Sequence, residues 1–168
     1  PFNEAERAIA DRTVEWMGVF FGHPVRELPP LDLNVLPERA WRRHPTWGNR
    51  QVHAPTVLNL LRGRRPADAV ALICLTRVDL YPEESWNYVF GQASLTDRVG
   101  VWSIHRLGDP VQEEALCFRR TIQVAAHETG HMLGLVHCPA FECGMNGSNH
   151  LEEGDRTPLW FCPDCELK

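Results

Sequence analysis

Residues 127–138 constrain this chain more than any other stretch, and they read His-Glu-Thr-Gly-His-Met-Leu-Gly-Leu-Val-His-Cys. They fit the pattern H-E-x-x-H-x-x-G-x-x-H at all five fixed positions. His127 and His131 are four residues apart, so on a helix they share one face and can bind a single zinc ion. Gly134 permits a positive φ that ends the helix, which lets His137 return as a third ligand.

The residue after the first histidine is Glu128, one step further round the same helix. Three protein ligands leave the fourth tetrahedral position open for water, which is typical of a catalytic zinc site. Glu128 can then act as the general base that activates the zinc-bound water. The alternative is an amphipathic helix with surface histidines, but at average residue usage the full pattern arises by chance in about 1 in 10⁵ chains of this length. We therefore predict a catalytic zinc bound by His127, His131 and His137.

Four of the six cysteines follow this motif with the spacing C-x₄-C and then C-x₂-C; they are Cys138, Cys143, Cys162 and Cys165. This spacing favours a closed structural Zn(Cys)₄ site that stabilises the C-terminal loop. Two disulfides or reduced buried thiols are the alternatives. Because Cys138 directly follows His137, we predict that the structural zinc also holds the third catalytic ligand in place. The other two cysteines, Cys74 and Cys117, are expected to be buried and inert.

Length and charge limit the remaining possibilities. The 168 residues suffice for one domain with a substantial core. The net charge of −5 and the scattered basic residues argue against a nucleic-acid partner. No apolar run approaches the length of a membrane span, so no membrane association is expected. The cysteines lack the separated pairs typical of secreted domains, which favours a cytoplasmic protein, and we expect a monomer.

Sequence patterns also predict the order of elements. Helices are expected over residues 4–16, where Asn3 and Glu6 form a capping pair, over 51–61, and from Asp109-Pro110 through the histidine motif. Strands are expected over residues 17–21, 69–76, 89–95 and 99–105, and residues 22–48 should be irregular with one short strand. This order predicts an α+β fold with one mixed sheet packed against helices.

With these residues in view, the chain resembles the archaemetzincins, a family of metzincin-like zinc peptidases. The resemblance rests on the histidine motif, on the four clustered cysteines and on Met145, which matches the methionine of the metzincin Met-turn. The segments 92–94 and 146–153 are also similar to the family. The spacing from Met145 to Cys162 is one residue short of the family pattern, and residues 1–85 match only in the order of elements.

The resemblance implies a metzincin-type zincin catalytic domain over residues 1–168, with a twisted mixed β-sheet and an active-site helix. Residues 1–134 would form an upper subdomain, and residues 135–168 a lower, zinc-stabilised subdomain that contains the Met-turn. The implied cofactors are two zinc ions, one catalytic and one structural. The implied activity is zinc-dependent hydrolysis of peptides or proteins, including aminopeptidase-type cleavage.

Two alternatives stay open: a zinc-stabilised peptide- or protein-binding module with little activity, and hydrolysis of a non-peptide amide. Glu128 favours an enzyme, because a metal site without catalysis has no need for that carboxylate. An extended substrate would pair with the strand over residues 89–95, which is otherwise an ordinary edge strand. Carboxylates are expected to orient the histidine ligands, with Glu142, Glu152 and Asp155 as unranked candidates. His150 is expected to be structural or exposed.

Overall fold

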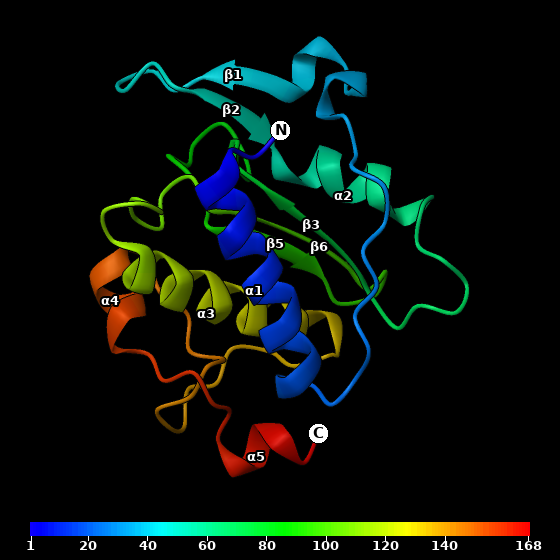
Figure 1. The fold of residues 1–168 in the computed structure, drawn as a ribbon, viewed down its shortest axis with the longest axis vertical. Coiled ribbons are helices and arrows are strands. Elements are labelled where there is room, and N and C mark those ends of the chain that lie inside the picture. Colours follow the sequence, from blue (N-terminus) through cyan, green and yellow to red (C-terminus); the bar gives the residue numbers. More distant parts are fainter.

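The computed structural model describes residues 1–168, and Figure 1 shows how its helices and strands are arranged. The helices are α1 (Glu4–Phe20), η1 (Leu33–Val35), η2 (Glu38–Ala40), α2 (Ala54–Arg62), α3 (Glu114–Met132), α4 (Leu151–Arg156) and α5 (Pro163–Glu166). The strands are β1 (Trp41–Arg43), β2 (Arg50–His53), β3 (Leu72–Thr76), β4 (Asp79–Tyr81), β5 (Gly91–Ser94) and β6 (Val99–Ser103). None of the helices combines the length and the apolar character needed to cross a bilayer.

The strands form two three-stranded sheets, ordered β1-β2-β4 and β3-β6-β5. Each sheet contains one parallel and one antiparallel pair, so the predicted mixed character is confirmed. The expectation of one sheet is wrong, because β4 pairs with β2 and only an isolated bridge between Leu80 and Val89 connects the two sheets. The strands expected over residues 69–76, 89–95 and 99–105 are present as the shorter β3, β5 and β6. In this order β5 is an edge strand.

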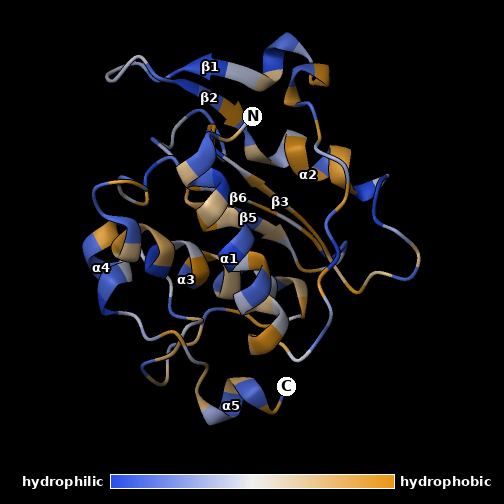
Figure 2. Ribbon diagram, viewed as in Figure 1, coloured by the Kyte–Doolittle hydropathy of each residue, from blue (hydrophilic) through white to orange (hydrophobic).

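Helices cover both faces of the β3-β6-β5 sheet. Val99 and Val101 of β6 are fully buried among residues of α2. Trp102 points to the other face, where it packs against Met17 of α1 and Met132 of α3. Successive side chains of a strand alternate between faces, so a strand with both faces covered is buried along its whole length, as β6 is. Figure 2 shows this buried layer as hydrophobic segments at the centre of the molecule.

The N-terminal helix begins as the sequence predicts but extends further. In the expected capping box, Glu6 donates its N–H to the Asn3 side chain at 2.9 Å, and Asn3 donates its N–H to the Glu6 carboxylate at 2.8 Å. The strand expected over residues 17–21 is wrong, since α1 continues to Phe20. Trp16 and Phe20 stack one helical turn apart, with ring centroids 4.5 Å from each other. Aromatic packing at helical spacing thus outweighs the β propensity of this short apolar run.

Two further helices begin later than expected. Residues 50–53 form β2, and α2 starts at Ala54 with Pro55 in its first turn, where an N–H would have no helical partner. The helix α3 starts at Glu114 rather than at Asp109. The Asp109 carboxylate does accept two N–H bonds, at 2.8 and 2.9 Å, but they belong to a separate turn before the helix.

The C-terminal segment after α3 lies at the opposite end of the molecule from β1 and β2 (Figure 1). It is mostly loop, with the short helices α4 and α5. Phe161 from this segment packs edge-on against Phe20 of α1, with ring centroids 5.4 Å apart. The segment is therefore attached to the rest of the molecule through α1 as well as through α3.

Candidate active site

The structure brings His127, His131 and His137 together. Their candidate ligand atoms lie within 4.8 Å of one another, and the Nε2 atoms of His127 and His131 are 3.1 Å apart. Tetrahedral zinc with bonds of about 2.0–2.1 Å would separate two nitrogen ligands by about 3.3 Å. Gly134 has the expected positive φ, 98°, which turns the chain out of α3 toward His137.

Backbone carbonyl groups orient the two helical histidines. The Nδ1 atom of His127 lies 2.9 Å from the Gly144 oxygen, and that of His131 lies 2.8 Å from the Leu135 oxygen. A carbonyl oxygen can only accept, so each Nδ1 carries the proton and each Nε2 keeps a free lone pair. The expectation that carboxylates orient these ligands is therefore wrong. Of the three candidates, Asp155 binds Arg120 instead, through two bonds of 2.7 and 2.6 Å.

Burial gives the two helical histidines the neutral state that metal binding needs. It lowers the pKa of His127 to about 4 and also lowers the pKa of His131, so both rings are neutral at neutral pH. The neighbouring Glu128 is only 7% exposed, and burial raises the pKa of its carboxyl to about 8.

A cleft of about 930 Å³ runs past the histidines and Glu128. One wall consists of residues 85–93, which include the start of β5, and the opposite wall consists of residues from α3 and from the segment 144–157. An extended chain could enter this cleft beside the free edge of β5. His150, in contrast, caps the N-terminus of α4 and is exposed, as expected from its sequence context.

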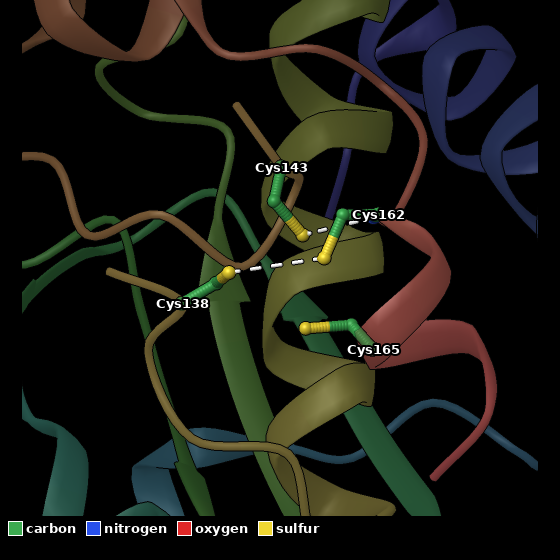
Figure 3. A group of neighbouring side chains, drawn as sticks. All are labelled: Cys138, Cys143, Cys162 and Cys165. Carbon is green, nitrogen blue, oxygen red and sulfur yellow. Dashed lines mark hydrogen bonds between the residues drawn. The ribbon is translucent and has the colours of Figure 1, made fainter. Parts of the chain in front are cut away.

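The four clustered cysteines also converge, and Figure 3 shows their sulfur atoms pointing toward a common centre. All four Sγ atoms lie within 4.8 Å of one another, and those of Cys138 and Cys162 are 3.8 Å apart. A tetrahedral metal with sulfur bonds of about 2.3 Å would separate the sulfur atoms by about 3.8 Å, whereas a disulfide needs about 2.05 Å. All six cysteines of the chain are free, which favours the metal site over two disulfides.

Backbone N–H groups surround these sulfur atoms, as is favourable for thiolates. Cys143 Sγ accepts from the N–H of Met145 at 3.4 Å and from that of Cys162 at 3.2 Å. The N–H groups of Ala140 and Phe141 lower the pKa of Cys138 to about 7. The donor set and its hydrogen bonds therefore fit a divalent metal such as zinc.

Met145 connects the two clusters. It is fully buried, and its carbonyl accepts the N–H of Cys138 at 2.9 Å. Its Sδ packs against the backbone of Gly130, where a Cβ atom would lie only 2.3 Å away. Gly130 lies between His127 and His131 in the sequence of α3, so the methionine packs against the helical turn that carries both histidines. The family resemblance identified Met145, but the sequence gave no sign that Gly130 makes room for it.

A family model described as peptidase family M54 matches residues 46–168. The chain belongs to this family. The archaemetzincin resemblance is thus confirmed: the chain is 34% identical to human archaemetzincin-2, over 95% of this chain and 53% of that protein. It is 45% identical to the archaemetzincin of Thermococcus kodakarensis, over 63% of this chain and 58% of that protein.

Solved archaemetzincins confirm the metzincin-like fold. The protein from Methanopyrus kandleri superimposes with a TM-score of 0.81 at 33% identity, covering 99% of this chain and 87% of that one. The protein from Archaeoglobus fulgidus, which was crystallised with malonate, gives 0.78 at 27% identity, covering 99% and 93%. The chain spans about half the length of the human relative, at 53%.

Proposed function

We propose that this archaemetzincin chain is a zinc-dependent metallopeptidase, with His127, His131 and His137 as ligands of the catalytic zinc. The observation that supports this most is the convergence of the histidine nitrogens beside Glu128 in an open cleft. When bound, zinc supplies Lewis-acid activation of water and of the peptide carbonyl. The neutral imidazoles of His127 and His131, each with its Nδ1 engaged by a carbonyl, suit such a site.

Glu128 is proposed as the general base and acid. Its carboxylate takes a proton from the water that attacks the scissile carbonyl, and then delivers that proton to the leaving amine. A group with a pKa near the working pH can do both. Burial raises the pKa of Glu128 to about 8, and a dication nearby would lower it again toward neutrality.

The cysteine cluster is proposed as a structural zinc site formed by Cys138, Cys143, Cys162 and Cys165. A closed set of four thiolates leaves no position for water or substrate, so the metal would have a structural role and take no direct part in hydrolysis. The division into residues 1–134 and 135–168 is proposed with it, since the second part supplies all four cysteines and six of the seven buried residues in the hydrophobic cluster around them. Two zinc ions per chain are therefore proposed.

The edge of β5 suggests how a peptide substrate would lie. Ser103 of β6 donates its N–H to the carbonyl of Phe90, which directs the backbone of Phe90 toward β6. Hydrogen-bonding directions alternate along a strand, so Gly91 and Ala93 direct their N–H and C=O groups to the free edge. An extended peptide paired there would pass Glu128.

Digestion of a peptide library by zinc-loaded protein tests the proposal. Free and N-acetylated versions of each peptide separate aminopeptidase-type cleavage from internal cleavage. A binding module would retain peptides without cutting them, and an amidase would cut only non-peptide amides. Hydrolysis of peptides that disappears on chelation and returns with zinc is the expected result, and an intact library under all conditions would contradict it.

The proposed catalytic site should keep its metal in mild acid. Neutral imidazole is the form that binds zinc, and the ordinary histidine pKa is about 6.5. Because burial lowers the pKa of His127 to about 4, its neutral form persists as the pH falls through 6.5 and is lost only near 4. Metal analysis after dialysis should therefore find catalytic zinc retained at about pH 5 and released near pH 4. Release with a midpoint at or above about pH 6 would contradict this expectation.

A further inference from the structure

A glycine of the edge strand lies directly against the carboxylate of Glu128. A Cβ atom built on Gly91 would lie 2.7 Å from Cγ, 2.8 Å from Oε1 and 2.9 Å from Cδ of Glu128. Non-bonded carbon atoms prefer separations of about 3.5–4.0 Å. Any side chain at Gly91 would therefore overlap the Glu128 side chain in its present position.

The backbone gives no other reason for a glycine here. The glycines with positive φ are Gly22, Gly48, Gly108 and Gly134, and Gly91 lies in a regular strand. An L-residue can adopt that conformation without strain. The three nearest atoms to the added Cβ all belong to Glu128, so the requirement for glycine comes from that side chain.

We infer that Gly91 is a positioning residue for Glu128: its lack of a side chain lets the carboxylate lie beneath the free edge of β5. This inference rests on the proposed function, in which Glu128 exchanges protons with water and the leaving amine. The same residue directs its backbone N–H and C=O into the cleft, so the peptide and the carboxylate meet at one place. A displacement of about 1 Å at such a site can lower the rate by about 100-fold.

The variant Gly91→Ala tests this role in catalysis. We expect kcat to fall by about 10- to 100-fold, with KM within about twofold and the catalytic zinc fully bound, because the metal ligands and most of the strand edge are untouched. A loss confined to KM would indicate that the added methyl group only blocks the peptide. That result, or an unchanged kcat, would overturn the inference.

The matched control is Gly100→Ala in the neighbouring strand β6. Its Cβ would lie 3.1 Å from Sδ and 3.2 Å from Cε of Met132, a flexible side chain that has to shift by only a few tenths of an ångström. We expect both kcat and KM of this variant to stay within about twofold of the wild type.

A cycle of melting temperatures tests the contact without any substrate. In the zinc-loaded wild type, Gly91→Ala should lower Tm by about 3–6 °C through overpacking. In the Glu128→Ala background the overlapping atoms are absent, so the same change should alter Tm by less than about 1 °C. The control Gly100→Ala should change Tm equally in both backgrounds. Equal losses for Gly91→Ala would overturn the role of Gly91, whereas an inactive wild-type protein would overturn the proposed function instead.

Discussion

Replacement of Glu128 by alanine should lower kcat for peptide hydrolysis by about 10²- to 10⁴-fold, while the catalytic zinc stays bound. The carboxylate is the buried acidic group beside the three histidines, and no other residue is proposed to carry protons there. His127 and His131 are oriented by the carbonyls of Gly144 and Leu135, so we expect removal of Glu128 to leave their geometry intact.

Steady-state kinetics combined with metal analysis measures both halves of this prediction. Glu128→Gln keeps the size of the side chain but cannot take a proton, so it should be similarly impaired. Glu114→Ala removes an exposed carboxylate from the same helix and should leave kcat within about twofold of the wild type. A Glu128→Ala protein with an unchanged rate would exclude Glu128 as the base, and loss of the catalytic zinc would show that it supports the ligands instead.

Replacement of Cys165 by serine should remove the structural zinc and lower occupancy of the catalytic zinc as well. Cys165 lies on α5 and contributes no atom to the histidine site, so any effect there must pass through the cysteine cluster. The proposed coupling between the two metal sites passes from Cys138 to the adjacent His137. Structural zinc supplies about 10 kcal/mol or more to small zinc domains, so we expect the free energy of unfolding to fall by more than about 3 kcal/mol.

Denaturant unfolding and metal counting would follow this variant, with Cys74→Ser as the control. Cys74 lies in β3, outside the cluster, and its serine variant should retain both metals. The same outcome as for Cys165→Ser is expected for Cys138→Ser. If either cluster variant kept full catalytic zinc occupancy and full activity, the two sites would be independent and the coupling would be wrong.

The convergence of the three histidines and of the four cysteines was predictable because short-range spacing determines it. Three local patterns fix where these side chains lie relative to one another. They are two histidines one helical turn apart, a glycine that ends the helix, and a cysteine pair with two residues between its members. Gly134 adopts the positive φ that this pattern requires. The capping box of Asn3 and Glu6 is local in the same way, and it too was correctly predicted.

Features that depend on distant partners were not predictable. The apolar run over residues 17–21 carries no sign that Phe20 will pack against Phe161. The carbonyl of Gly144 orients His127. Every residue of the chain has such a carbonyl, so the sequence does not show which one will face the histidine. The contact between Gly91 and Glu128 likewise exists only once β5 lies over α3.

Native mass spectrometry tests the central claim most directly, since it counts the zinc ions bound to each chain. We expect two, one at His127, His131 and His137 and one at the four clustered cysteines. The triple variant His127→Ala, His131→Ala, His137→Ala should retain one ion, at the cysteines. A wild-type protein that binds one zinc or none after loading would contradict the account.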